Sequence, residues 1–220
     1  MEYTSNLTAE VVEHMGSDQT VAMAARVSTG KEDDAGRLEG LINYLVREKH
    51  TSTLEHCVVT FKIEAPIFVA REAMRHRTFS FNEISGRYAK LEPKFYVPDT
   101  TRPLVNKGTG AHPKLVVSAQ QQELHRAVDA TSEAVSTYAY TLYEGLIEQG
   151  VATEVARNVL PVSIYTRWYQ TANLNNWFKF LELRQAENAQ WEIRQIANQV
   201  ADALETLYPV TVAAWRKHRA

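Results

Sequence analysis

Cysteine is almost absent from this chain of 220 residues, with Cys57 its only example. A single cysteine excludes a disulfide within the chain and suits a reducing cytosol. No run of apolar residues approaches the roughly 18 that a membrane-spanning helix needs. The N-terminus also lacks the basic region and the apolar run of a signal peptide. We therefore expect a cytoplasmic protein with no membrane partner.

Several common ligand motifs are missing as well. There is no Gly-x-Gly-x-x-Gly fingerprint and no P-loop, so any dinucleotide must bind outside a Rossmann fold. The seven histidines show no His-x-x-x-His spacing and no zinc-type Cys/His spacing, so we expect no bound metal. The net charge of -2 creates no field over the whole molecule that would attract nucleic acid.

Apolar residues make up 45% of the sequence, which is enough for a core in one domain or in a compact two-lobed one. Helical periodicity predicts helices at 34–49, about 66–75, 113–149, 153–160, 174–184 and 193–207, with another beginning at 17–18. Alternation predicts strands at 57–63 and 163–171. We expect loops at 28–34 and 75–88, a polar turn at 50–55, and extended or irregular backbone at 93–103. The expected fold is α+β, a helix-rich single domain over 1–220 with a small mixed or antiparallel sheet.

The longest predicted helix carries an apolar seam. Its members recur at alternating spacings of four and three residues: Leu124, Val128, Thr131, Val135, Tyr138 and Leu142. Such spacing is typical of a helix that packs along another helix. Gly150 is expected to end the helix.

The stretch 75–88 has the least ordinary composition in the chain. It reads Arg-His-Arg-Thr-Phe-Ser-Phe-Asn-Glu-Ile-Ser-Gly-Arg-Tyr. Its guanidinium groups match phosphate oxygens, and Ser85-Gly86-Arg87 offers successive backbone donors of the kind that hold an anion. A solvated basic loop is the ordinary alternative, but polar groups this dense and varied favour a binding site.

Arg75, His76 and Arg77, followed after seven residues by Ser85, resemble the signature of the flavin-dependent thymidylate synthases. Segments 50–56, 65–70, 154–167 and 180–192 extend the resemblance over most of the chain. The resemblance implies an enzyme that methylates dUMP to dTMP, with 5,10-methylenetetrahydrofolate as carbon donor. NADPH would reduce a bound FAD, which would sit in a non-Rossmann site. The family also implies a homotetramer whose sites draw on several subunits.

The same resemblance implies two sets of site residues. The residues expected to bind the cofactor are Ser52, Arg75, His76, Arg77, Glu83, Asn173, Asn175 and Lys179. Those expected to bind the nucleotide are Glu72, Arg75, Glu83, Ser85, Gly86, Arg87, Arg157 and Arg184. The chain departs from the usual family pattern at Glu72, Asn175, Lys179 and 187–188. The resemblance therefore supports the roles of these positions less strongly than it supports the roles of the central motif.

Arg184 follows Leu181 by three residues and Trp177 by seven, so it extends the apolar stripe of its helix. An arginine in such a place needs a partner, because a buried unpaired charge is costly. A structural ion pair is one interpretation. The resemblance implies instead that Arg184 is catalytic, with its permanent charge favouring loss of the uracil N3 proton and an electron-rich C5.

Other residues allow two interpretations. Arg157 follows Glu154 by three residues, which on spacing alone predicts a surface pair, whereas the resemblance makes Arg157 a nucleotide contact. Cys57 alternates with Val59 and Phe61 in a predicted strand, so packing is favoured over a nucleophilic role. His50 and His56 flank a polar turn and are as well explained by structure as by function.

A protein without catalytic activity that binds nucleic acid is the competing hypothesis. It would place Arg71, Arg75, Arg77 and Arg87 on phosphates. The near-neutral charge of the chain and the acidic Glu72 and Glu83 beside these arginines argue against it.

Overall fold

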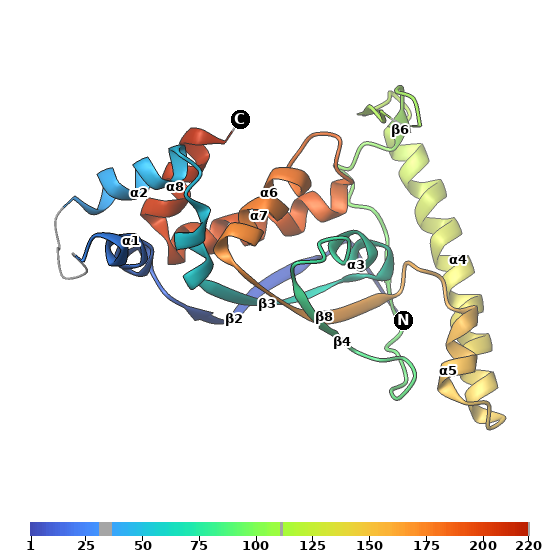
Figure 1. Cartoon of the computed structure of the whole chain (residues 1–220). Coiled ribbons are helices and arrows are strands. Elements are labelled where there is room, and N and C mark those ends of the chain that lie inside the picture. Colours follow the sequence, from blue (N-terminus) through green and yellow to red (C-terminus); the bar gives the residue numbers. More distant parts are fainter. Residues whose placement is uncertain (31–36, 111, 220) are drawn as a thin grey trace. The chain divides into compact units, whose positions relative to one another are not determined.

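The computed structural model describes residues 1–30, 37–110 and 112–219 (Figure 1). Its backbone forms two compact units. Unit 1 contains Met1–Leu7, Glu64–Ala73 and Glu83–Trp168, and unit 2 contains Thr8–Ile63, Met74–Asn82 and Tyr169–Ala220. The chain passes between the units several times, and each is described by itself below. That all of 1–220 forms one domain stays a prediction.

A four-stranded sheet, most of which belongs to unit 2, has the strand order β2-β3-β8-β4. The strands are β2 (Thr8–Met15), β3 (Val58–Pro66), β8 (Tyr165–Asn173) and β4 (Ser80–Glu83). In β3 the side chains of Val59, Phe61 and Ile63 are fully buried, as the alternating pattern predicts. The two predicted strands are therefore confirmed, each displaced by one to three residues at its ends. The strands β2 and β4 were not predicted.

Two smaller pairings complete the strands. In the first, β1 (Glu2–Thr4) runs parallel to β5 (Lys94–Tyr96), and in the second β6 (Val105–Asn106) runs antiparallel to β7 (Leu115–Val116). Because helices dominate and the sheets are small, the predicted α+β class is confirmed.

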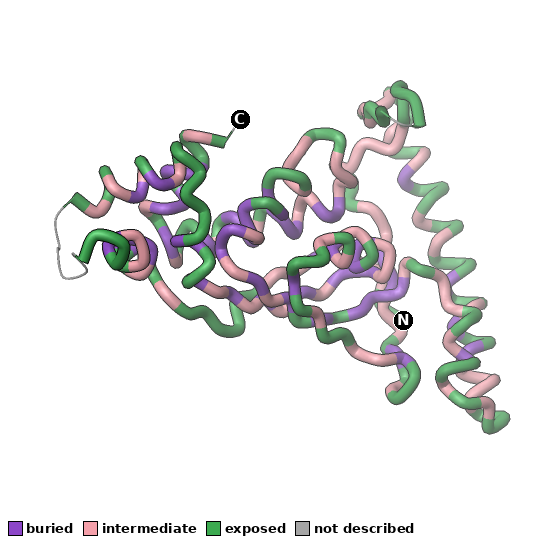
Figure 2. The backbone as a smooth tube through the Cα atoms, in the orientation of Figure 1, coloured by how far each residue is buried: buried purple, intermediate pink, exposed green. Residues whose placement is uncertain are grey.

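Unit 2 contains five α-helices among its described residues: α1 (Asp18–Arg26), α2 (Leu38–Arg47), α6 (Leu174–Arg184), α7 (Trp191–Leu207) and α8 (Pro209–His218). Short 3₁₀ turns lie at η1 (Val27–Thr29) and η2 (Thr51–His56). Helix α7 packs on β2, and α6 and α7 lie along one side of β2 and β3 (Figure 1). The buried residues of this unit lie where its helices meet one another and where they meet the strands (Figure 2).

Unit 1 contains α3 (Ile67–Ala73), α4 (Gln121–Glu148), α5 (Thr153–Ala156) and the turn η3 (Arg157–Val159). Its core joins Tyr140 and Tyr143 of α4 to Leu91, Phe95 and Ile164. The Tyr140 hydroxyl donates to the Leu91 carbonyl at 2.8 Å, and the Leu91 amide donates to the Tyr143 hydroxyl at 3.1 Å. These bonds attach the chain just after the central motif to α4.

Several predictions of local structure were wrong or imprecise. The helix predicted at 113–149 begins only at Gln121, because Pro113 and the β-branched residues near Val116 favour extended backbone. The helix predicted at 66–75 ends at Ala73, and the predicted loop 75–88 contains β4. The helix predicted at 34–49 is observed as Leu38–Arg47, and residues 34–36 lie outside the described part of the chain. Most of the loop predicted at 28–34 also lies outside the described residues.

Most of the apolar seam of α4 is exposed among the described residues, although Leu124 is half-buried. Val135 is 54% exposed, Tyr138 69% and Leu142 43%. The buried residues of this 28-residue helix lie on a different, narrow face: His125, Ser136, Tyr140 and Tyr143. The seam therefore remains available to a partner. None of the described helices has the length and apolar character needed to cross a membrane.

Candidate functional site

The central motif enters unit 1 at Glu83, the last residue of β4. The Thr166 hydroxyl on β8 donates to Glu83 Oε1 at 2.6 Å, and the Ile84 amide donates to the Arg167 carbonyl at 3.0 Å. Strand β8 therefore orients the exposed Glu83 carboxylate. Sequence reasoning selected Glu83 but not Thr166, because nothing in a lone threonine of a strand predicts this contact.

The following turn is built around Ser85 and Gly86. The Ser85 carbonyl accepts from the amides of Tyr88 and Ala89, and its hydroxyl accepts from the Arg87 amide at 3.3 Å. The Arg87 amide, one of the donors predicted to hold an anion, is therefore bonded inside the turn. Gly86 is buried, and a Cβ there would lie 3.1 Å from Arg157 Cδ. The missing side chain lets Arg157 approach the turn.

Arg87 is held at two points by the start of α5. Its Nε donates to Glu154 Oε2 at 2.8 Å, and the Thr153 hydroxyl donates to the Arg87 carbonyl. The Arg87 side chain remains about half exposed, at 53%. Spacing alone predicted a surface pair between Glu154 and Arg157. The structure instead pairs Glu154 with Arg87, which is distant in the sequence. Arg87 and Arg157 thus both lie at the Ser85–Gly86 turn, an arrangement suited to a phosphate.

In unit 2 the motif meets helix α6. Arg184 Nε donates to His76 Nε2 at 3.0 Å. Since arginine Nε always carries a hydrogen, His76 Nε2 must accept, which assigns the ring proton to Nδ1. The His76 ring also lies 4.9 Å from the Phe180 ring and 5.8 Å from the Phe79 ring, centroid to centroid. The structure thus brings together two residues that the sequence separates by 108 positions.

The remaining predicted cofactor residues of unit 2 differ in exposure and in hydrogen-bond partners. Arg75, Arg77 and Ser52 are exposed. Asn173 caps α6, because its Oδ1 accepts from the Asn176 amide at 2.9 Å, which leaves its side-chain amide as a donor for a ligand. Asn175 is buried, and its Nδ2 donates to Glu55 Oε1 at 3.2 Å. Glu72 belongs to unit 1, in α3.

A cavity of about 370 Å³ lies in unit 2 beside two of the predicted cofactor residues. Its lining consists of Leu45, Val46, Lys49, Thr51, Leu54, Asn175, Phe178, Lys179, Glu182, Trp215, His218 and Arg219. Apolar walls with a few charged groups are typical of sites for nucleotide-sized ligands. The donor set, which is mostly cationic, fits the pyrophosphate of FAD.

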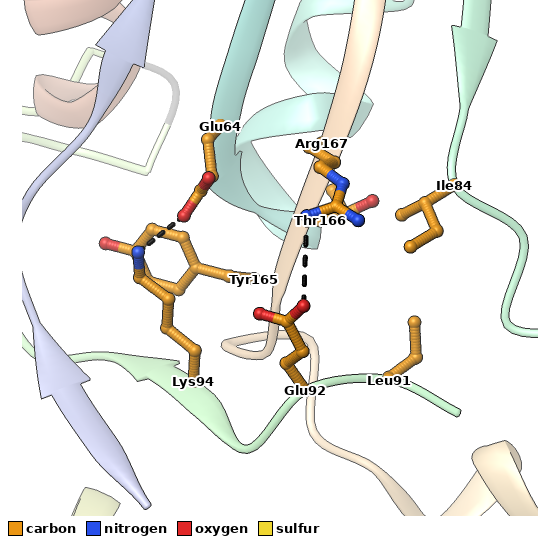
Figure 3. Close-up of a pocket in the computed structure, with 8 residues that line it drawn as sticks. All are labelled: Glu64, Ile84, Leu91, Glu92, Lys94, Tyr165, Thr166 and Arg167. Atoms are coloured by element: carbon orange, nitrogen blue, oxygen red, sulfur yellow. Dashed lines mark hydrogen bonds and ion pairs between the residues drawn. The ribbon is translucent and has the colours of Figure 1, made fainter. Parts of the chain in front are cut away.

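Unit 1 has a second, smaller cavity next to Glu83 (Figure 3). Its lining is Glu64, Ile84, Leu91, Glu92, Lys94, Tyr165, Thr166 and Arg167, and its volume of about 30 Å³ suits water rather than a substrate. Lys94 Nζ lies 2.5 Å from Glu64 Oε1, and Arg167 Nη1 lies 3.8 Å from Glu92 Oε1. Burial opposes the charge of Lys94, but the bond to Glu64 and the Glu64 and Glu2 charges outweigh it and raise the Lys94 pKa. We interpret this cavity as structural.

Comparison with known proteins agrees with the motif. Residues 10–210 match the model of the family described as "Thymidylate synthase complementing protein". The chain belongs to this family.

Several curated relatives are named flavin-dependent thymidylate synthase. The one from Thermus thermophilus is 42% identical over 209 residues, 94% of this chain and 75% of the relative. The one from Streptomyces coelicolor is 42% identical over 230 residues, 98% and 93% respectively. The resemblance inferred from the Arg-His-Arg motif is confirmed, and the chain is an enzyme of the flavin-dependent thymidylate synthase type.

A solved structure shares the whole fold. The UMP/dUMP methylase PolB from Streptomyces cacaoi, bound with 5-Br dUMP, has a TM-score of 0.91 and 40% sequence identity, covering 99% of this chain and 97% of PolB. The competing hypothesis of a nucleic-acid-binding protein without catalytic activity is set aside, since the relatives are enzymes.

Proposed function

We propose that this chain catalyses the reductive methylation of dUMP to dTMP. 5,10-Methylenetetrahydrofolate, NADPH and a proton are consumed with dUMP, and tetrahydrofolate and NADP⁺ leave with dTMP. The observation that carries the proposal is the hydrogen bond from Arg184 to His76, because it joins the signature motif to the arginine expected at the uracil ring. The PolB title, which names UMP and dUMP, supports a uridine nucleotide as substrate.

In this proposal the turn in unit 1 binds the nucleotide. Arg87 and Arg157 attract its phosphate, with Ser85 and Gly86 shaping the turn between them. Arg87 keeps its two terminal nitrogens for the phosphate, because Glu154 engages only its Nε. Glu83, oriented by Thr166, accepts from a sugar hydroxyl or from the flavin edge. Glu72 and Arg75 complete the nucleotide set.

Arg184 polarises the uracil ring. A guanidinium stays protonated at any working pH, so it acts as a fixed electrostatic stabiliser rather than as a base. Its charge favours loss of the N3 proton, which makes C5 more electron-rich and ready to accept the one-carbon unit. His76 accepts from Nε and so fixes the direction in which the two terminal nitrogens point.

FAD, when bound and reduced by NADPH, supplies the hydride that completes the methyl group. We assign its binding to Ser52, Arg75, His76, Arg77, Glu83, Asn173, Asn175 and Lys179. Support comes from the cavity beside Asn175 and Lys179 and from the free donor of the Asn173 side chain. We also propose a cytoplasmic homotetramer with shared sites, which the exposed seam of α4 supports.

The test is to purify the full-length protein, record its absorption spectrum and measure dTMP with each component omitted in turn. We expect a yellow protein that forms dTMP only when FAD, NADPH and the folate are all present. UMP is assayed in parallel, because PolB is named for both nucleotides. A colourless protein that takes up no added FAD, or methylation that proceeds without flavin, contradicts the proposal.

A further inference from the structure

The Glu83 carboxylate has one oxygen engaged by the protein and one left over. The Thr166 hydroxyl donates to Oε1 at 2.6 Å. Among the described residues, no other side chain forms a hydrogen bond or an ion pair with this carboxylate, so Oε2 keeps its full capacity to accept. Glu83 is exposed, whereas Thr166 is only 4% exposed. A hydrogen bond from a hydroxyl shielded from water to a carboxylate is strong, and it fixes Oε1 in one place.

The donor of this bond is itself rigid. Thr166 lies in β8, and a β-branched side chain in a strand has few accessible rotamers. The backbone beside it is fixed by the bond from the Ile84 amide to the Arg167 carbonyl at 3.0 Å. Thr166 also lines the water-sized cavity of unit 1 (Figure 3). Glu83 therefore presents one free oxygen, Oε2, from a fixed position.

The place of Glu83 in the chain indicates which group this oxygen meets. Glu83 precedes the turn at Ser85 and Gly86 by two residues, a span of at most about 7 Å. Arg87 and Arg157 lie at the same turn and suit a phosphate. The sugar of a nucleoside monophosphate is bonded directly to its phosphate. A phosphate at the turn therefore brings a sugar hydroxyl within reach of Glu83.

A single free carboxylate oxygen distinguishes two sugars. Ribose carries neighbouring 2′- and 3′-hydroxyls, and a carboxylate with both oxygens free can accept one hydrogen bond from each. Deoxyribose offers only the 3′-hydroxyl, which needs one acceptor. Because Thr166 engages Oε1 of Glu83, the extra hydroxyl of a ribose is left without this acceptor. A hydroxyl that loses its hydrogen bond to water and gains no other binds less well.

We propose that Thr166 makes Glu83 select deoxyribose over ribose, so that dUMP is preferred to UMP. Thr166 is a positioning residue, since it acts through Glu83 and need not touch the nucleotide. The inference rests on the proposed function, because it takes the nucleotide phosphate to lie at the turn after Glu83. It also chooses between the two partners proposed for Glu83, in favour of the sugar hydroxyl over the flavin edge.

The experiment measures kcat and KM for dUMP and for UMP, with full-length protein loaded with FAD and with the folate and NADPH present. The test variant is Thr166→Val, because valine keeps the branched shape and lacks the hydroxyl. Alanine is less suitable, since a water from the adjoining cavity can take the place of the hydroxyl. Thr166→Ser keeps the donor. The matched control is Thr171→Val, which removes from the same strand a hydroxyl that lies 2.8 Å from the Thr60 hydroxyl instead.

We expect Thr166→Val to lower the ratio of kcat/KM for dUMP to that for UMP about tenfold. About half of this change, on a logarithmic scale, should be a KM for dUMP raised roughly threefold, since Glu83 is less ordered. The rest should be better use of UMP, whose 2′-hydroxyl gains Oε1 as an acceptor. The kcat for dUMP and the FAD content should stay near wild type. Thr166→Ser and Thr171→Val should keep the wild-type ratio, and urea unfolding verifies that each variant is folded.

An unchanged ratio in Thr166→Val overturns the inference, as does a wild type that uses both nucleotides equally well. Loss of FAD from Thr166→Val without a change in the nucleotide kinetics overturns it too, because Glu83 would then serve the flavin. These results leave the proposed function intact. A wild type that forms no dTMP overturns the proposed function instead, and calorimetry with dUMP and UMP then tests the inference through the same ratio of affinities.

Discussion

Arg87 has its position determined by residues 66 and 67 positions further along the chain, Thr153 and Glu154. Glu154 accepts from Arg87 Nε, so the edge of the Arg87 guanidinium that carries the two terminal nitrogens is left for a phosphate. An exposed pair of this kind is worth less than about 1 kcal/mol by itself. Its importance therefore lies in orientation rather than in stability.

We predict that Glu154→Gln raises the KM for dUMP roughly threefold, because Arg87 loses its charged anchor. The kcat and the FAD content should stay near wild type, which separates a positioning role from misfolding. Glu154→Asp should restore part of the loss. A lower KM in Glu154→Gln would show that Glu154 merely competes with the phosphate, since the substitution also removes a negative charge.

For Arg184 we predict that substitution by lysine reduces dTMP formation about a hundredfold, or ~3 kcal/mol, although the charge is kept. Lysine cannot present the planar fork that donates to His76 and to a ring at once. Flavin binding and its reduction by NADPH should persist. Normal methylation by Arg184→Lys, or loss of flavin reduction alone, would assign Arg184 a different role.

Cys57 is fully buried, and its thiol donates to the Ser17 carbonyl at 3.6 Å. Burial raises its pKa to about 11, so no reactive thiolate is present at neutral pH. We predict that Cys57→Ser keeps its activity and loses about 1 kcal/mol of stability, measured by urea unfolding. The pKa of the Cys57 thiol lies above its ordinary value in the folded protein. The stabilisation that the buried, protonated thiol contributes is therefore present below pH 9.0 and is lost as the pH rises toward 11. The difference in stability between wild type and Cys57→Ser should shrink over that range.

At the scale of elements, α8 depends on a residue from α1. Buried Asp18 accepts from the amides of Val210 and Thr211 at 3.0 and 2.9 Å and from the Thr211 hydroxyl at 2.6 Å. These amides belong to the first turn of α8, whose donors have no partner within the helix. The acidic side chain also complements the positive end of the helix dipole.

We predict that Asp18→Asn destabilises the protein by about 2 kcal/mol, because an amide replaces one acceptor with a donor opposite buried N–H groups. Urea unfolding measures the change. Asp202→Asn, at an exposed position of α7, provides the control and should cost little. Equal midpoints for the two variants would mean that Asp18 does not hold α8.

The secondary structure was predictable where one face of an element is buried in its own unit. The stripe Leu174, Trp177, Phe178 and Leu181 predicted α6 with both of its ends correct. The strand β2 was missed because most of its residues are exposed, so no alternation appears. Helix α8 was missed because the group that caps it lies 192 positions earlier, at Asp18.

At the scale of the whole molecule, α4 is a helix whose apolar seam remains mostly exposed in a single chain. Its seam is exposed although the spacing is typical of helix packing. An exposed apolar stripe of this length is typical of an interaction site, and we propose that the partner is a second copy of this chain.

We predict that Val135→Glu lowers the mass of the assembly in solution, measured by light scattering after gel filtration, because a charge would be buried at the contact. Gln149→Glu, at an exposed position beyond the seam, should leave the mass unchanged. An unchanged mass in Val135→Glu would exclude the seam as an interface between subunits.

The sequence by itself determined the class of enzyme, because seven residues separate Arg-His-Arg from Ser85 and that spacing is local. It also determined which helices and strands have a buried face. Only the tertiary structure decided the partners: His76 for Arg184, Glu154 for Arg87, and Lys49 with Arg219 around one cavity. Side-chain contacts between distant segments depend on how the elements pack, and no local pattern of residue types records that packing.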